Sequence, residues 1–180
     1  MIKENIFNLY QNDIFVETGS YIGDGVQAAI DAGFNEIYSC ELSPVHYEEC
    51  KKRFDGDKRV NLELCKSDEF LTMLSKVVFP ATIWLDAHYS GGNTALGKNI
   101  SPLMEELDTI KKCYDGGRPM YDTILIDDMR CWNDKDRYGF VQWDVIQKLL
   151  EINPNFKFRF HDGMSGSGEV FKNDILVAIP

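Results

Sequence analysis

The sequence predicts an α/β protein with a mainly parallel sheet, and three features of the chain lead to this fold class. Short apolar runs alternate with amphipathic helical segments over the 180 residues. A glycine-rich turn follows the first apolar run, and no helical segment separates the last two runs. Because parallel strands require crossover connections whereas antiparallel neighbours do not, this order predicts a parallel sheet that ends in an antiparallel hairpin.

Seven apolar runs are predicted to form the strands of one sheet. Most are rich in β-branched and aromatic residues, which favour strands, and are flanked by polar or turn-forming residues. The predicted strands cover residues 13–17, 36–41, 60–65, 81–86, 122–127, 156–161 and 174–179, with a glycine-rich turn at 163–168 between the last two.

Helical segments fill the other intervals and are predicted to cover both faces of the sheet. Ser43 and Pro44 suit the N-cap and the first position of the second helix, and Gly33 suits the end of the first. The predicted helices cover residues 24–32, 44–54, 68–77, 101–112 and 141–152, residues 129–140 form a long polar loop, and residues 1–180 form a single domain.

Composition and charge argue against several classes of partner. The net charge of −10 repels nucleic acids and anionic lipids, so neither is expected to bind. No apolar run approaches the ~20 residues of a membrane span, and the first residues do not read as a secretory signal. Five scattered cysteines without a CxxC pair indicate a reduced, cytoplasmic protein. The sequence gives no indication of the oligomeric state.

The loop after the first strand is predicted to bind a cofactor. Gly19 permits a tight turn and a close approach of the backbone to a ligand, and Gly23 and Gly25 follow at a spacing that differs from GxGxxG. Glu17 and Asp24 flank the position where a dinucleotide would place its pyrophosphate, so a cationic ligand is favoured there. The expected cofactor contacts in this segment are Glu17, Thr18, Gly19, Ser20, Gly23 and Asp24; a purely structural turn is the alternative.

Two further strand ends carry residues suited to a nucleoside. Glu41 ends the second strand and precedes Leu42, and an acid at this position typically accepts hydrogen bonds from both ribose hydroxyls. Since NAD presents its ribose in the same way, Glu41 indicates a nucleoside and leaves the type of cofactor open. Ser67 and Asp68 follow the third strand, where capping of the next helix is the alternative role for Asp68.

An acidic cluster is predicted where the fourth and fifth strands end. Asp86 and His88 follow one strand and Asp127 and Asp128 the other, and parallel strands end at the same edge. Packed carboxylates suit a hard cation such as Mg²⁺ or Mn²⁺, which can lower the pKa of a substrate hydroxyl. His88 is expected to act as general base, with metal ligation or support of Asp86 as alternatives. Helix capping and simple solvation are the structural alternatives for the aspartates.

Together these motifs resemble the class I, Rossmann-like S-adenosylmethionine-dependent methyltransferases, and among them the metal-dependent sugar O-methyltransferases of the macrocin type. The resemblance covers the chain from Asp13 to the last strand. It implies S-adenosylmethionine as cofactor, adenine contacts at Ser67 and Asp68, and metal ligation by Asp86, Asp127 and Asp128, with Asp86 also beside the methyl donor. It implies a catalytic base at His88, although the family usually has an aspartate there.

The resemblance predicts methyl transfer to a hydroxyl of a sugar or glycan, and several side chains are candidates for contacting it. The alternatives are a catechol or other small diol as acceptor, a nicotinamide-dependent oxidoreductase, and a non-catalytic binding module. Aromatic rings can pack against a sugar, although packing in the core or in a lid is the alternative for each of them. The candidate substrate residues are Tyr21, Tyr89, Ser90, Arg130 and Trp132.

Overall fold

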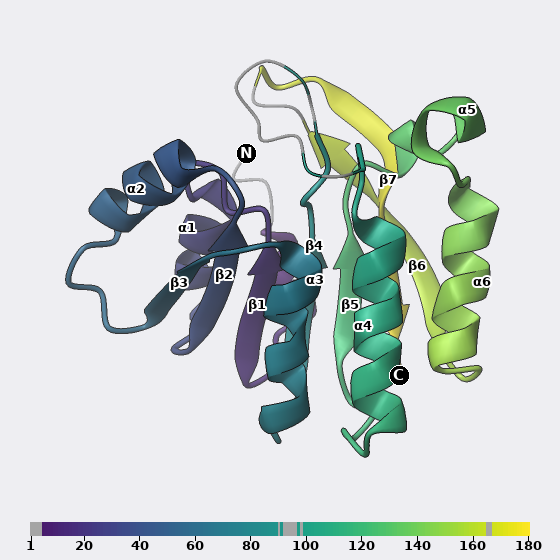
Figure 1. The fold of residues 1–180 in the computed structure, drawn as a ribbon, viewed down its shortest axis with the longest axis horizontal. Coiled ribbons are helices and arrows are strands. Elements are labelled where there is room, and N and C mark those ends of the chain that lie inside the picture. The colour runs from purple at the N-terminus through teal and green to yellow at the C-terminus, as the bar shows by residue number, and fades with distance from the viewer. Residues whose placement is uncertain (1–4, 90, 92–96, 98, 165–166) are drawn as a thin grey trace.

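A computed structural model describes residues 5–89, 91, 97, 99–164 and 167–180. Its centre is one seven-stranded sheet with the strand order β3-β2-β1-β4-β5-β7-β6 (Figure 1). Only β7 pairs antiparallel with its neighbours, β5 and β6, whereas the other described pairs are parallel. The predicted fold class, a mainly parallel sheet with a final antiparallel hairpin, is therefore confirmed.

The strands form where the apolar runs predicted them. The first five agree with the predicted bounds to within one residue at each end. The strands are β1 (Ile14–Thr18), β2 (Ile37–Glu41), β3 (Val60–Leu64), β4 (Ala81–Leu85), β5 (Thr123–Ile126), β6 (Lys157–Met164) and β7 (Val170–Ile179).

Helices cover both faces of the sheet, as expected for crossover connections (Figure 1). One apolar core packs between the sheet and α3, η2, α4 and α6, and a second packs between the other face and η1, α1 and α2. The helices are η1 (Ile6–Leu9), α1 (Asp24–Asp31), α2 (Pro44–Arg53), α3 (Ser67–Phe70), η2 (Leu71–Lys76), α4 (Leu103–Asp115), η3 (Met129–Cys131), α5 (Lys135–Tyr138) and α6 (Gln142–Ile152).

The structure tests two predicted N-cap residues and one predicted helix end. Ser43 is the N-cap of α2 and accepts a hydrogen bond from the backbone N–H of His46. Gly33 follows α1 with a φ of 91°, the left-handed conformation typical of a glycine at a helix end. The alternative role for Asp68 was wrong, because α3 begins at Ser67 and its N-cap, Lys66, makes no side-chain cap bond.

Three segments depart from the prediction. The third helix divides into α3 and a 3₁₀ segment, η2, where Thr72 and Ser75 hydroxyls donate to backbone carbonyls three residues earlier. The predicted polar loop at 129–140 contains η3 and α5, and its Met129 and Phe140 are buried. The predicted turn at 163–168 begins later than expected, because β6 continues through Gly163 to Met164.

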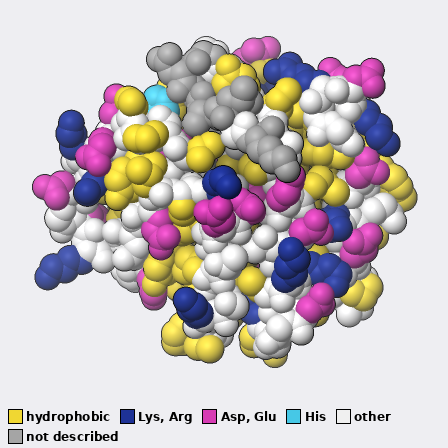
Figure 2. All heavy atoms as spheres, viewed as in Figure 1, with side chains coloured by type: hydrophobic (Ala, Val, Ile, Leu, Met, Phe, Trp, Pro, Cys, Tyr) yellow, Lys and Arg dark blue, Asp and Glu magenta, His cyan; other side chains and the backbone are white. Residues whose placement is uncertain are grey.

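Charged side chains of both signs are interspersed on the face that carries α3, α4 and α6 (Figure 2). Apolar side chains lie between them. Within the described ranges, no helix is long and apolar enough to cross a membrane.

Candidate cofactor and metal site

The parallel strands bring the predicted site residues to one edge of the sheet. Thr18 pairs with Leu85 across β1 and β4, and Leu85 pairs with Ile126 across β4 and β5. The residues that follow these pairs therefore leave the sheet side by side. Loop residues after β1 meet Asp86 and Asp127 at this edge, as expected for the ligand crevice of an open α/β sheet.

Gly19 is required by the close contact between the first loop and the end of β4. Its φ is 82°, and a Cβ there would lie 2.7 Å from the carbonyl oxygen of Asp86 and 2.9 Å from the Cα of Ala87. The backbone N–H groups of Gly19 and Ser20 both donate to the carbonyl of Cys40 on β2. The loop is thus fixed to strands on both sides, and Ser20 is buried within it.

The other loop residues contact the protein's own side chains. Gly23 starts α1 with a φ of 89°, and a Cβ there would lie 2.4 Å from the ring of Phe54. Asp24 pairs with Arg53 at 2.6 Å, and its side chain is 79% exposed. Both residues therefore join α1 to α2, and their contact with the cofactor stays a prediction.

Glu17 lies beneath the loop and is 2% exposed. Ser39 donates a hydrogen bond of 2.6 Å to its carboxyl group, and a Cβ at position 25 would lie 1.8 Å from its Oε1. Burial raises the pKa of Glu17 to about 8, and the nearby charges of Asp86 and Glu41 add to this. Glu17 is thus a buried acid whose raised pKa favours the neutral form, and its contact with the cofactor stays a prediction.

The substitution Glu17→Gln should make the stability of the protein less sensitive to alkaline pH. The pKa of Glu17 is higher in the folded chain than in the unfolded one, so between about pH 4.5 and pH 8 the folded state binds more protons. Its contribution to stability is therefore lost as pH rises through this window. Urea unfolding at pH 5 and pH 9 should show a smaller loss for Glu17→Gln than for the wild type. Equal losses would contradict the raised pKa.

Glu41 holds the loop through backbone hydrogen bonds. Its two carboxylate oxygens accept from the N–H groups of Tyr21 at 2.8 Å and Ser43 at 2.7 Å. Tyr21 has a φ of 45°, lies against the ring of His46 and is 43% exposed. Leu42 is 39% exposed at the same strand end. The structure therefore brings Glu41, Leu42 and Tyr21 together beside the predicted nucleoside position.

Ser67 begins α3 and is buried, with Asp68 next to it in the first turn. A buried acid that the sequence analysis missed, Glu106 on α4, lies against this segment. Burial raises the pKa of Glu106 to about 7, and the nearby hydroxyls of Ser67 and Thr18 partly oppose this rise.

The three predicted metal ligands come together. One carboxylate oxygen from each of Asp86, Asp127 and Asp128 lies within 4.8 Å of the other two. Burial raises the pKa of Asp127 to about 8, and the charges of Asp86 and Asp128 raise it further. Three converging oxygen donors in a partly buried position fit a hard divalent cation such as Mg²⁺ or Mn²⁺, which would offset this repulsion.

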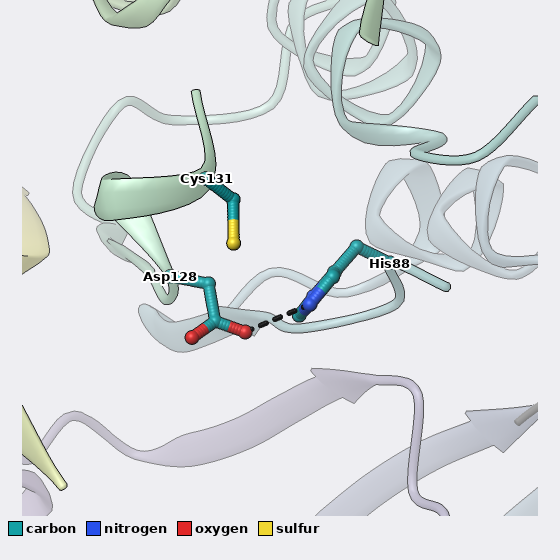
Figure 3. A group of neighbouring side chains, drawn as sticks. All are labelled: His88, Asp128 and Cys131. Atoms are coloured by element: carbon teal, nitrogen blue, oxygen red, sulfur yellow. Dashed lines mark ion pairs between the residues drawn. The ribbon is translucent and has the colours of Figure 1, made fainter. Parts of the chain in front are cut away.

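Asp128 also belongs to a second group of donors with His88 and Cys131 (Figure 3). The His88 Nε2 lies 2.8 Å from a carboxylate oxygen of Asp128. Burial and the charge of Asp128 raise the pKa of the Cys131 thiol, which disfavours the thiolate that a softer metal requires. The oxygen-only group is therefore the better candidate for a metal.

His88 lies between two aspartates in this structure. Its Nδ1 lies 3.6 Å from Asp86, opposite the contact with Asp128. Burial alone would lower the pKa of His88, but the hydrogen bonds and charges of Asp128 and Asp86 outweigh it and raise the pKa to about 10. The raised pKa favours the protonated imidazole, and the role of His88 as general base stays a prediction. A metal ion on the aspartates would compete with that proton for the same negative charge.

Asp128 and Asp174 fix the position of Arg130. The guanidinium pairs with both carboxylates, and its carbon lies 4.0 Å from the centre of the Phe171 ring. The backbone N–H of Arg130 donates to Asp174 at 2.9 Å. Asp128 itself has a φ of 57°, a conformation uncommon for residues other than glycine and found at functional sites.

The other candidate substrate residues differ in their burial and contacts. Trp132 is 2% exposed and packs against Tyr138, Phe140 and His88, so the alternative of core packing is correct for it. Tyr89 is partly buried, and its N–H donates to the carbonyl of Ile100. Ser90 lies outside the described residues.

A cavity of about 470 Å³ with several polar lining residues adjoins Arg130. Phe160 is 43% exposed there, and Asn173 has a φ of 54° within β7. The amide of Gln142 donates to the Met129 carbonyl and is thereby held at the cavity. Its lining consists of Arg130, Asn133, Gln142, Phe160, Lys172 and Asn173.

Two acids near the centre were missed as site residues. Asp174 was predicted only as the first residue of a strand, although it is 1% exposed and binds Arg130. Glu106 falls on the apolar stripe formed by Leu103, Leu107 and Ile110 at helical spacing. An acid on the buried face of an amphipathic helix is a signal that could have identified it.

Comparisons with known proteins bear on the fold. No protein-family model matches the chain, and no curated protein matches it. Among solved structures, an O-methyltransferase from Bacillus cereus in complex with SAH has a TM-score of 0.65 at 11% identity, covering 97% of this chain and 77% of that one. The O-methyltransferase TomG from Streptomyces achromogenes, in complex with SAM, has a TM-score of 0.65 at 12% identity, covering 97% and 75%.

Spermidine synthase from Thermotoga maritima also matches, with a TM-score of 0.59 at 15% identity, covering 97% of this chain and 56% of that one. Proteins with different names thus share this architecture, and function has to be argued from the site. The chain has the Rossmann-like fold that these O-methyltransferase structures share.

Proposed function

We propose that the protein is an S-adenosylmethionine-dependent O-methyltransferase that uses a divalent metal to methylate a hydroxyl of a sugar or glycan. The observation that carries the proposal is the convergence of Asp86, Asp127 and Asp128 within 4.8 Å at the strand edge, beside the Gly19 loop. A bound cofactor at the loop and a bound metal at the aspartates would then be neighbours. This is the arrangement needed to bring a hydroxyl to a methyl donor.

The cofactor side of the proposal rests on the first loop and the strand ends next to it. Gly19 lets the loop approach the end of β4, and Glu41 lies at the end of β2 where a ribose would be recognised. Leu42 offers a partly exposed apolar side chain beside it. SAM and SAH occur in solved structures of the same fold, which supports this class of cofactor.

The metal side of the proposal assigns a separate task to each group of this chain. Asp86, Asp127 and Asp128 would hold Mg²⁺ or Mn²⁺, which when bound lowers the pKa of a coordinated hydroxyl. His88 lies between Asp86 and Asp128 and would be the group that takes up the proton of the acceptor hydroxyl. Arg130 holds Asp128 in place from the other side.

The acceptor is proposed to enter the polar cavity beside Arg130. Amide side chains of Asn133, Gln142 and Asn173 can exchange hydrogen bonds with hydroxyls, and the exposed ring of Phe160 can pack against the C–H face of a sugar. A small diol needs fewer such contacts. The cavity therefore favours a sugar over the catechol alternative.

Binding of S-adenosylhomocysteine tests the cofactor class. Isothermal titration with Mg²⁺ present should show saturable binding in the micromolar range, and NADH titrated in the same way should show none. If the folded protein instead binds NADH and does not bind S-adenosylhomocysteine, the oxidoreductase is supported. Failure of both ligands to bind would contradict the enzyme and leave a binding module.

The substitution Asp127→Asn should weaken metal binding by about tenfold or more, because it removes one of three negative oxygen ligands. Electron paramagnetic resonance of Mn²⁺ measures the free ion directly. Asp115→Asn, which removes an exposed acid of α4 away from this centre, is the matched control and should change nothing. S-adenosylhomocysteine affinity should stay within about twofold in both variants. Unchanged Mn²⁺ affinity in Asp127→Asn would refute the metal role.

A further inference from the structure

Asp174 lies at an irregularity of the antiparallel hairpin that β6 and β7 form. The strand pairing shifts register between His161 and Gly163 of β6, so residues 172–174 of β7 have only one residue opposite them. Asp174 ends this irregular stretch and is 1% exposed. Irregular pairing of this kind is common next to functional sites, because it redirects a side chain that a regular strand would place elsewhere.

Gly163 on β6 leaves room for the Asp174 carboxylate. A Cβ at position 163 would lie 2.6 Å from the Oδ2 of Asp174 and 3.0 Å from its Cβ. The φ of Gly163 lies outside the left-handed region, so its backbone conformation does not by itself require glycine. The missing side chain therefore matters for the contact between the two strands at Asp174.

The Asp174 carboxylate holds both the backbone and the side chain of Arg130. Its Oδ1 accepts a hydrogen bond from the backbone N–H of Arg130 at 2.9 Å, and its Oδ2 accepts from the guanidinium. The ring of Phe171, on the same strand, lies 4.0 Å from the guanidinium carbon. Although the Arg130 side chain is 40% exposed, its position is thus fixed by β7.

The guanidinium held in this way also lies against Asp128, one of the three proposed metal ligands. Arg130 pairs with the Oδ1 of Asp128, whereas His88 lies 2.8 Å from its Oδ2. Two carboxylates share the single positive charge of Arg130, so Asp128 keeps more negative charge for a cation than it would in a pair with Arg130 alone. Contacts behind a metal ligand typically change metal affinity about 10- to 100-fold.

We infer that Asp174 is a positioning residue for the proposed metal site: it holds Arg130 against Asp128 and shares its positive charge. Asp128 is thereby presented as a charged ligand beside Asp86 and Asp127, with which it converges within 4.8 Å. Asp174 is not itself one of the converging ligands, and its effect passes through Arg130. This inference deepens the proposed function and rests on its metal side.

The first test compares Asp174→Asn with Asp162→Asn, the same substitution at a more exposed position of the hairpin, where the acid pairs with Lys172 at 2.6 Å. Mn²⁺ affinity, measured by electron paramagnetic resonance of the free ion, should fall about tenfold in Asp174→Asn and less than about twofold in Asp162→Asn. Affinity for S-adenosylhomocysteine, titrated calorimetrically without metal, should stay within about twofold in both. Equal Mn²⁺ affinities in Asp174→Asn and the wild type would overturn the role. A loss of both affinities together with Tm would overturn it too, because that is the result of a merely structural role.

Gly163→Ala tests the position of Asp174 without removing a charge. The added Cβ would displace the Asp174 carboxylate, so Mn²⁺ affinity should fall at least about threefold, while binding of S-adenosylhomocysteine is kept. The double variant with Asp174→Asn should lose less than the product of the two single effects, because both substitutions disturb the same contact. Unchanged Mn²⁺ affinity in Gly163→Ala would show that Asp174 acts through its charge alone and would overturn the positioning role.

Failure of this role and failure of the proposed function give different results. A wild type that does not bind Mn²⁺ refutes the metal side of the proposed function and this role together. A wild type that binds Mn²⁺ no more tightly than its Asp174→Asn variant refutes only the role. If Asp174→Asn does not fold, Gly163→Ala decides alone, and an unchanged Mn²⁺ affinity overturns the role.

Discussion

The substitution Asp122→Ala should destabilise the protein by roughly 3–5 kcal/mol, because it leaves a buried guanidinium without its counter-charge. The Asp122 carboxylate is 1% exposed and accepts two hydrogen bonds of 2.7 Å from Arg118. It also accepts from the hydroxyl of Tyr114 at 2.6 Å and from the N–H of Ala81 at 2.7 Å. Truncation would leave the Nε–H of Arg118, the hydroxyl of Tyr114 and the N–H of Ala81 unpaired in the interior.

Differential scanning calorimetry should show the loss as a fall in Tm of roughly 10 °C or more. The matched control is Asp115→Ala, which removes an exposed acid paired at 2.7 Å with Lys111 four residues earlier on α4. An exposed pair of this kind contributes about 0.5 kcal/mol, so Tm should hardly change. A loss below about 1 kcal/mol in Asp122→Ala would show that Arg118 finds other partners in the folded chain.

The substitution Gly19→Ala should abolish cofactor binding and destabilise the fold. The added Cβ would lie 2.7 Å from the Asp86 carbonyl oxygen, on a backbone whose φ of 82° is already unfavourable for alanine. Since the obstacle is backbone rather than a flexible side chain, the loop has to move away from β4. We expect a loss of stability of about 3 kcal/mol and an affinity for S-adenosylhomocysteine reduced at least about 100-fold.

Gly56→Ala separates the penalty of the positive φ from the steric clash with the end of β4. Gly56 has nearly the same φ, 80°, but a Cβ there would meet nothing within 4 Å. This control should lose only about 1 kcal/mol, the conformational penalty, and should bind S-adenosylhomocysteine as the wild type does. If Gly19→Ala behaved like Gly56→Ala in both measurements, the close contact of the loop with β4 would not matter for the site.

Much of the fold followed from the order of short-range patterns. Apolar runs flanked by acids predicted all seven strands, because strand formation depends on local burial and β-branched residues. The absence of a helical segment between the last two runs predicted the antiparallel hairpin. The third helix was predicted less well. The Arg118 guanidinium donates to the carbonyls of Leu74 and Phe79, near the end of this segment. Such a contact between segments far apart in the chain is not visible in a local pattern.

The positions of the site residues were predictable because parallel strands end at a common edge. This placed Asp86, His88, Asp127 and Asp128 together, and the structure brings these side chains into contact. Their charge states were not predictable from spacing. The proton on His88 depends on how closely Asp86 and Asp128 approach it, and the neutral form of Glu17 depends on burial under the loop.

The sequence by itself determined the architecture and the edge of the sheet at which chemistry can occur, since both depend on periodicity and chain order. Only the tertiary structure decided which charged groups face a ligand and which face one another. The sequence presents Asp24 as an acid of the first loop, but in the structure it pairs with Arg53. It presents Glu106 as one of several acids of a helix, but in the structure Glu106 is buried. The reason is physical: burial and charge pairing depend on contacts between residues far apart in the chain.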